Sequence, residues 1–161
     1  MPPARIAILG ATSYIAKGLI AHWAQRHDHH ELFLYARSPE QTHCFLKQLG
    51  LARAHVFSID MFGSHQYDII INCVGIGSPQ KLNEHMSAIF RITSSFDELI
   101  LDYLGKKPET LYRNFSSGAA YGTDFSQPAD EQSKTQFPLN DLKPETFYGI
   151  AKLHSEARHR A

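Results

Sequence analysis

Apolar residues in this chain gather in short runs, and each run is followed by a longer segment with a helical pattern. The first run is Ile6–Leu9, which ends at Gly10. A continuous apolar run of this length is typical of a strand that is buried on both faces, as in a parallel sheet. Residues Leu19–Trp23, after a short loop, have the pattern of a helix. We therefore expect a strand, a tight loop and a helix at the start of the chain.

The same alternation continues to the end of the sequence. Strands are expected at residues 31–37, 54–59, 67–75 and 110–115, and helices at residues 39–49 and 80–104. Glycines that follow these two helices, Gly50 and Gly105, are typical helix ends. Strands that alternate with helices form right-handed βαβ units around a parallel sheet. The pattern predicts a Rossmann-type α/β fold with helices on both faces and strand order 3-2-1-4-5. The length of 161 residues predicts one domain, residues 1–161.

The loop after the first strand is a candidate phosphate site. It has the sequence Gly10-Ala11-Thr12-Ser13-Tyr14-Ile15-Ala16-Lys17-Gly18. Small residues let a loop backbone approach a pyrophosphate, and the following helix N-terminus supplies free N–H groups. The usual fingerprint has three glycines, and here Ser13 and Ala16 stand where the second and third would be. An ordinary strand-to-helix turn remains the alternative.

The end of the second expected strand bears on the choice of dinucleotide. An acidic residue there would hold the ribose 2′-hydroxyl of NAD. The chain has Ala36-Arg37-Ser38 instead, and an arginine suits the 2′-phosphate of NADP. The alternative is a solvated arginine at a strand end. We expect NADP in preference to NAD.

Polar or small residues stand at the carboxyl ends of all five expected strands. They are Gly10, Arg37, Asp60, Gly75 and Ser117. Ligands of open parallel sheets bind at the carboxyl ends of the strands, so this coincidence indicates one binding edge.

A second candidate site is the segment Tyr148-Gly149-Ile150-Ala151-Lys152. On a helix, Tyr148 and Lys152 would lie on one face, one turn apart. A nearby ammonium stabilises a phenolate, so such a tyrosine can exchange a proton near neutral pH. The spacing is common by chance, and it becomes informative only within a dinucleotide-binding fold.

Composition and charge limit the other functions. Hydrophobic residues make up 43% of the chain, and 16 basic residues balance 16 acidic ones. The chain has no excess of basic residues of the kind that binds nucleic acid. The N-terminal apolar run is too short for a signal peptide or a membrane span. Cys44 and Cys73 form no disulfide framework, so a reducing compartment, the cytoplasm, is expected. For Cys73 we expect packing rather than a reactive thiol.

Two other clusters have plain structural explanations. His27-Asp28-His29-His30 follows a predicted helix, where histidines complement the dipole and face solvent. No second ligand cluster has metal-site spacing, so no metal is expected. The last helix of the alternation has an apolar stripe that we expect to be helix core: Phe90, Phe96, Leu99, Ile100 and Tyr103.

Several motifs together resemble the short-chain dehydrogenase/reductase superfamily, in its extended branch of nucleotide-sugar epimerases, dehydratases and reductases. The matching segments are residues 10–16, Asn72–Gly75, Phe115-Ser116-Ser117-Gly118-Ala119-Ala120-Tyr121-Gly122, and Pro144–Glu156. Their order and spacing match the family along the whole chain. The Ser-Ser…Tyr-Gly and Pro…Tyr-Gly-x-x-Lys-Leu-x-x-Glu elements are specific to the extended branch.

This resemblance implies a role for each matching residue. Tyr148 matches the proton-transferring tyrosine, Lys152 the lysine that assists it and bonds the nicotinamide ribose, and Ser117 the serine that holds the reacting oxygen. Asp60 and Met61 match positions that flank the adenine. The implied cofactor-binding residues are Gly10, Thr12, Ser13, Tyr14, Ile15, Arg37, Asp60, Met61, Cys73, Val74, Gly75, Ser116, Tyr148 and Lys152.

The chain also departs from the family pattern. The family's asparagine on the long helix has no clear counterpart, and Arg91 falls near it. Extended-family chains run on beyond this length and add a C-terminal substrate region, so we expect a fragment or a truncated gene product. Family dimers pair the long helix with the helix of Tyr148, so a homodimer is expected.

These observations lead to two hypotheses of different classes. The first is an NAD(P)-dependent enzyme that epimerises, dehydrates or reduces a nucleotide-activated sugar, with Tyr148 as acid–base group. The second is a catalytically idle dinucleotide-binding module that senses or scaffolds.

Overall fold

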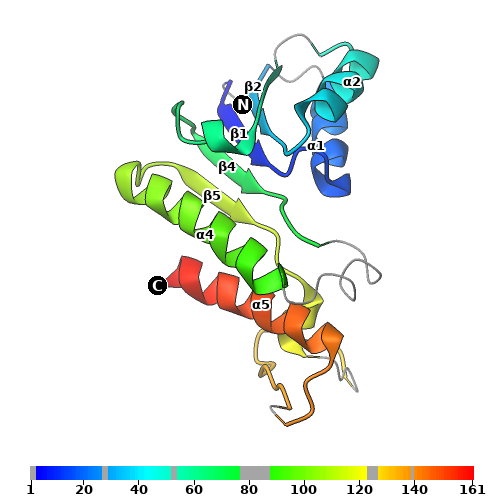
Figure 1. Ribbon diagram of the computed structural model, residues 1–161, viewed down its shortest axis with the longest axis vertical. Helices are drawn as coiled ribbons and strands as arrows, with labels where there is room; N and C mark the ends of the chain where they lie inside the picture. The colour runs from blue at the N-terminus through cyan, green and yellow to red at the C-terminus, as the bar shows by residue number, and fades with distance from the viewer. Residues whose placement is uncertain (1–2, 27–28, 52–53, 77–87, 123–126, 139) are drawn as a thin grey trace. The chain divides into compact units, whose positions relative to one another are not determined.

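The computed structural model describes residues 3–26, 29–51, 54–76, 88–122, 127–138 and 140–161 (Figure 1). By its internal contacts the chain divides into two compact units. The first unit comprises residues 1–74 and 103–115, and the second comprises residues 75–102 and 116–161. The expectation of a single domain stays a prediction.

The first unit holds a five-stranded parallel sheet with the order β3-β2-β1-β4-β5, which confirms the predicted topology. Its register is level at the carboxyl edge, where Leu9 pairs with both Tyr35 and Asn72. The strands of the sheet are β1 (Arg5–Leu9), β2 (Glu31–Tyr35), β3 (Ala54–Phe57), β4 (Ile69–Asn72) and β5 (Leu111–Asn114).

Two helices, α1 (Tyr14–Gln25) and α2 (Pro39–Leu49), pack their apolar sides on one face of this sheet. Burial of aliphatic side chains from both layers provides the main stabilisation here. Gly50 ends α2 in the left-handed conformation, with φ of +66°, as a C-terminal glycine does. The buried residues of this core include Ile6, Ile8, Ala16, Ile20, Leu32, Leu34, Leu46 and Ile71.

The opposite face of β2 is aromatic. Tyr35, fully buried, stacks on Phe57 and shares a hydrogen bond between hydroxyl groups with Tyr67. The backbone N–H of Tyr67 donates to the Tyr103 hydroxyl over 3.0 Å. Burial, together with the hydrogen bond to Tyr67, raises the pKa of Tyr35 far above its usual value, and burial also raises the pKa of Tyr67. Both phenols are therefore held in the neutral form.

The crossover from β3 to β4 contains a single short turn of 3-10 helix, η1 (Ile59–Met61). Asp60 and Met61 lie on this turn rather than directly at the end of β3, and both are exposed. Phe62, the next residue, packs edge-on against Tyr35. The aromatic cluster therefore anchors the short crossover.

The second unit consists of most of helix α4 (Ala88–Lys106), the 3-10 helix η2 (Gly118–Tyr121) and helix α5 (Pro144–Arg160). Helices α4 and α5 run in the same direction, because Phe90 contacts Phe147 and Asp97 contacts Ser155 (Figure 1). The first eight residues of the predicted helix 80–104 lie outside the described residues. The helix continues past Gly105, which lies near its end. A Cβ added at Gly105 would meet no atom within 4 Å.

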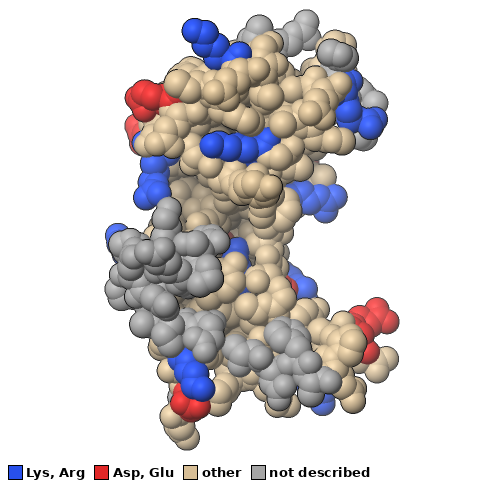
Figure 2. Space-filling model, turned by 90° about the vertical axis from the view of Figure 1, so that its right-hand side faces the viewer, with Lys and Arg blue, Asp and Glu red and all other residues tan. Residues whose placement is uncertain are grey.

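Lysine and arginine side chains on the face shown in Figure 2 are spread over it, and uncharged surface separates them. Among the described residues, none of the helices has the length and apolar character needed to cross a membrane. The expectation that nucleic acid is no partner stays a prediction.

Candidate active site

Gly10 shapes the loop between β1 and α1. Its φ is +75°, and a Cβ at this position would lie 3.0 Å from backbone atoms of Cys73 and Val74. The turn after β4 therefore approaches the first loop as closely as a glycine permits. The N–H groups of Gly10 and Ala11 both donate to the Tyr35 carbonyl, at 3.0 and 3.1 Å. This ties the loop to the end of β2.

Ser13 caps helix α1, because its Oγ accepts a hydrogen bond from the Ala16 N–H over 3.2 Å. The first two helical residues, Tyr14 and Ile15, are apolar and yet exposed, Tyr14 to 94%. A helix N-terminus behind a glycine-containing loop offers free backbone N–H groups that suit an anion such as a phosphate. Thr12 is half-buried in the same loop.

The ends of β2 and β3 lie next to each other, since the Ala36 N–H donates to the Phe57 carbonyl over 3.1 Å. Arg37 follows β2 and is exposed. The first unit thus places Arg37, Asp60 and Met61 after neighbouring strands at the carboxyl edge of the sheet. Cys73, which is 8% exposed, is held by its N–H to the Leu9 carbonyl at 2.9 Å, and its burial agrees with the packing expected for it.

In the second unit, Tyr148 and Lys152 lie on α5, and the Lys152 Nζ is 6.0 Å from the centre of the Tyr148 ring. A Cβ on Gly75 would lie 3.9 Å from the same Nζ. The ammonium group therefore lies near both the Tyr148 ring and Gly75. Both side chains are half-buried, so they can still meet a ligand.

Ser117 caps the N-terminus of η2, because its Oγ accepts a hydrogen bond from the Ala119 N–H over 3.2 Å. Helix η2 meets α5 backbone to backbone: a Cβ on Gly149 would clash with the Ala119 carbonyl oxygen and lie 3.0 Å from the Phe137 ring. Only glycine allows this approach. Because Gly149 is next to Tyr148, this contact brings the segment that starts at Ser117 to the turn of α5 that carries Tyr148.

Ser116, exposed itself, donates a hydrogen bond to Glu156 Oε1. Glu156 also pairs with Arg160 at 3.2 Å. Glu156 lies one turn after Lys152 on α5. The hydrogen bond from Ser116 therefore attaches the chain just before η2 to α5 at a second point.

Comparison with known protein families matches residues 6–161 to the NAD dependent epimerase/dehydratase family. This chain belongs to that family. The match confirms the resemblance to the epimerases and dehydratases.

Solved structures of two epimerases have the same fold. The UDP-glucose 4-epimerase from Bifidobacterium longum, in complex with NAD+ and UDP, aligns with a TM-score of 0.76 and 16% identity over 97% of this chain. The UDP-Glc/GlcNAc 4-epimerase from Campylobacter jejuni aligns with a TM-score of 0.76 and 17% identity over 98% of this chain. This epimerase/dehydratase chain spans 48% of either structure, about half their length. Among curated protein sequences, none matches it.

The predicted site residues of this epimerase/dehydratase chain fall into two sets. The first unit contains Gly10, Thr12, Ser13, Tyr14, Ile15, Arg37, Asp60, Met61, Cys73 and Val74. The second unit contains Gly75, Ser116, Ser117, Tyr148 and Lys152. Within each unit the structure brings the members to the same strand ends or to α5.

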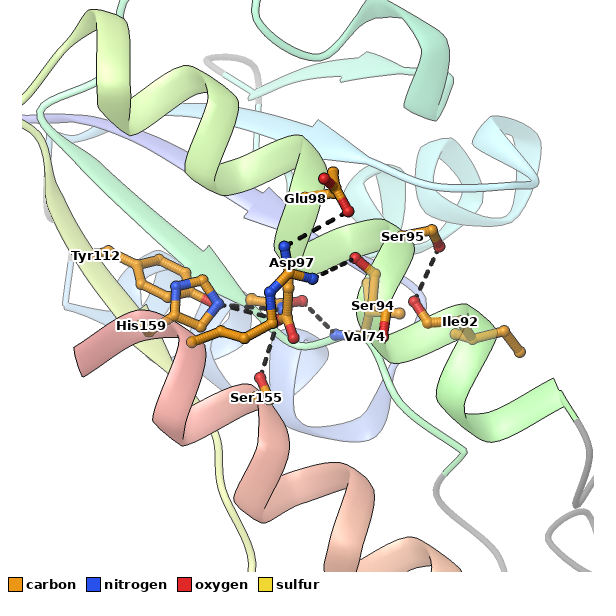
Figure 3. A network of polar contacts seen from close by, with 11 residues as sticks. Val74, Ile92, Ser94, Ser95, Asp97, Glu98, Tyr112, Ser155 and His159 are labelled. Atoms are coloured by element: carbon orange, nitrogen blue, oxygen red, sulfur yellow. Dashed lines mark hydrogen bonds and ion pairs between the residues drawn. The ribbon is translucent and has the colours of Figure 1, made fainter. Parts of the chain in front are cut away.

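Sequence reasoning missed two features of the second unit. One is the close approach at Gly149, which a glycine inside a predicted helix could have signalled. The other is a buried contact of Asp97 with Ser155 and His159 (Figure 3). The available signal was an acid three residues before Ile100, on the apolar side of the predicted helix.

The histidine cluster after α1 lies partly outside the described residues, which omit His27 and Asp28. His30 accepts from the Ala4 N–H over 3.2 Å and packs edge-on against Trp23. The described residues contain no group of three histidine, cysteine or carboxylate side chains that could hold a metal ion.

Proposed function

We propose that this chain supplies the dinucleotide-binding and acid–base parts of an enzyme that epimerises, dehydrates or reduces a nucleotide-activated sugar. The observation that carries the proposal is the pair of Tyr148 and Lys152 on α5, with the Nζ 6.0 Å from the ring centre. Membership of the epimerase/dehydratase family supports it. The Bifidobacterium longum epimerase structure holds UDP, and that of the Stenotrophomonas maltophila epimerase holds formylated UDP-arabinopyranose, which supports a nucleotide sugar as the substrate class.

The residues of the first unit fit a dinucleotide. Gly10 keeps the loop free of a side chain where it meets Cys73 and Val74, and the start of α1 presents backbone N–H groups suited to a pyrophosphate. Asp60 and Met61 would flank the adenine, and the turn Cys73–Gly75 would face the cofactor ribose.

Arg37 would select between the two dinucleotides. The β2 end has no acid beside Arg37, which favours the 2′-phosphate of NADP. The family name and the bound NAD+ of the Bifidobacterium longum structure favour NAD instead. We propose NADP as the preferred cofactor and NAD as the weaker one, and titration of both decides the matter.

When bound, the nicotinamide supplies or accepts a hydride at the carbon that bears the reacting oxygen. Tyr148 would give a proton to that oxygen or take one from it, according to the direction of the reaction. Lys152 would stabilise the phenolate with its charge and hold the nicotinamide ribose. Ser117 would hold the reacting oxygen by a hydrogen bond.

The proposal is tested by Tyr148→Phe, with UDP-glucose as the first substrate. The change removes one oxygen atom, so folding and cofactor binding should be retained. Turnover should fall by a factor on the order of 10²–10⁴, the usual contribution of a positioned proton donor. Lys152→Met should weaken cofactor binding in addition.

Tyr112→Phe is the matched control, because it deletes a phenol oxygen whose contact with Asn72 is a long one of 3.4 Å. It should leave turnover unchanged. Equal turnover in Tyr148→Phe and wild type would make Tyr148 a helix residue only. Tight dinucleotide binding without any turnover would instead favour the idle binding module.

A further inference from the structure

Asp97 is an acidic residue in the interior of the second unit. It lies on α4, and only 1% of its surface is exposed. Its Oδ1 accepts two hydrogen bonds, one from Ser155 Oγ over 2.9 Å and one from His159 Nε2 over 3.0 Å (Figure 3). Both donors lie on α5 and are one helical turn apart. One carboxylate oxygen therefore binds two successive turns of the neighbouring helix.

Such an arrangement is sensitive to the register of the two helices. A buried carboxylate is strongly unfavourable unless hydrogen bonds compensate for its lost hydration. A shift of α5 by one residue corresponds to about 1.5 Å along its axis and a rotation of about 100°, which would remove both donors from Asp97. Apolar contacts such as that between Phe90 and Phe147 tolerate small displacements far better, since the hydrophobic effect is not directional.

The helix that is held in this way is the one that carries the proposed chemistry. Lys152 and His159 are seven residues apart, and so are Tyr148 and Ser155, which is close to two helical turns. Each pair therefore shares one side of α5. A change of register at Ser155 and His159 would displace Tyr148 and Lys152 by the same amount.

We propose that Asp97, Ser155 and His159 form a buried polar lock that sets the register of α5 against α4. In this role they are positioning residues for Tyr148 and Lys152, which rests on the function proposed above. The lock acts through Lys152, because a displaced ammonium no longer reaches the ribose of the dinucleotide.

A neighbouring contact between the same helices provides the control. Arg158 reaches the Ser94 carbonyl over 3.3 Å and Glu98 Oε2 over 3.4 Å. The Glu98 side chain is 68% exposed, so this ion pair is screened by water and contributes little. Glu98→Gln therefore removes a negative charge at the same pair of helices and leaves Asp97, Ser155 and His159 unchanged.

The experiment measures NADP+ and NAD+ affinity by calorimetry in folded variants of this chain. His159→Leu removes one donor and should weaken binding by about tenfold or more, whereas His159→Gln keeps an N–H donor and should restore it. Asp97→Leu combined with His159→Leu removes the buried charge with its partner, so it should fold as wild type does. This double variant should nevertheless bind dinucleotide weakly, because no polar contact selects the register.

Lys152→Met separates positioning from a general structural effect. If the lock acts through Lys152, His159→Leu should cause no further loss of affinity in the Lys152→Met background. Full additivity of the two changes would overturn the proposal. Wild-type affinity in the folded Asp97→Leu/His159→Leu variant would overturn it too, and would leave the proposed function standing.

Hydrogen exchange of the amides in residues 146–160 gives a reading that needs no cofactor. His159→Leu should raise exchange in α5 and leave β1 and β4 unchanged, while Glu98→Gln should alter neither. Unchanged exchange in α5 would refute the lock. Failure of the wild-type chain to bind either dinucleotide would count against the proposed function. The exchange data alone would then show whether Asp97, Ser155 and His159 hold α5 in register.

Discussion

The close approach of η2 to α5 at Gly149 permits a quantitative test with an internal control. Gly18 and Gly149 both lie inside helices, α1 and α5. Replacement of a helix-interior glycine by alanine stabilises a helix by about 1 kcal/mol, because alanine restricts the unfolded chain and has the higher helix propensity. At Gly18 nothing lies within 4 Å of the added Cβ, so the full gain is expected.

At Gly149 the added Cβ would collide with the Ala119 carbonyl oxygen and press on the Phe137 ring at 3.0 Å. The first of these atoms belongs to the backbone, so η2 has to move by on the order of 1 Å to restore a carbon–oxygen contact. Overpacking of this kind costs about 1–3 kcal/mol. The helix-propensity gain is common to both variants, so the difference in stability between Gly18→Ala and Gly149→Ala is expected to be about 1–3 kcal/mol.

Urea denaturation monitored by circular dichroism measures both free energies of unfolding. For a chain of this size, the difference corresponds to roughly 2–4 °C of melting temperature per kcal/mol. The displaced η2 also moves Ser117, so Gly149→Ala should reduce turnover as well. Equal stabilisation by the two substitutions would refute the argument that backbone contact at Gly149 positions η2.

Three further predictions concern the cofactor, alkaline stability and assembly. Arg37→Ala should weaken NADP+ binding and leave NAD+ binding nearly unchanged; tighter binding of NAD+ by the wild-type chain would contradict the NADP preference. Because burial raises the pKa values of Tyr35 and Tyr67 above 10.0, their contribution to stability is fully present below about pH 10 and is lost as the pH rises further. Urea titrations from pH 8 to 11 should show this loss, and Tyr35→Phe should make it shallower; an equally steep loss in that variant would exclude Tyr35 as a cause. Light scattering should detect a homodimer formed through α4 and α5, and a monomer at high concentration would exclude it.

Local sequence patterns determined most of the secondary structure. The apolar run before Gly10 became β1, and the predicted helix 39–49 coincides with α2. Strand β2 ends at Tyr35, two residues earlier than predicted. The reason is that Arg37 is followed directly by Ser38, the N-cap of α2, and by Pro39, its first residue. The alternation of these elements was enough to predict the parallel order of the sheet, since right-handed crossovers leave few other arrangements.

Candidate site residues at strand ends could also be predicted from the sequence. Strand ends and a Tyr-x-x-x-Lys spacing are local features, so Gly10, Arg37, Tyr148 and Lys152 could be singled out without a structure. Their roles stay predictions, because they depend on a bound dinucleotide and substrate.

Only the tertiary structure decided the contacts that hold α5 in place. Asp97 and His159 are separated by 62 positions in the chain, and Gly149 is crowded by Ala119 and Phe137 from two other segments. Hydrophobic periodicity predicts which side of a helix is buried, but it does not say which neighbour supplies the donors for a buried acid. That choice depends on the register between two packed helices, which is set by the sum of all their contacts rather than by any local run of residues.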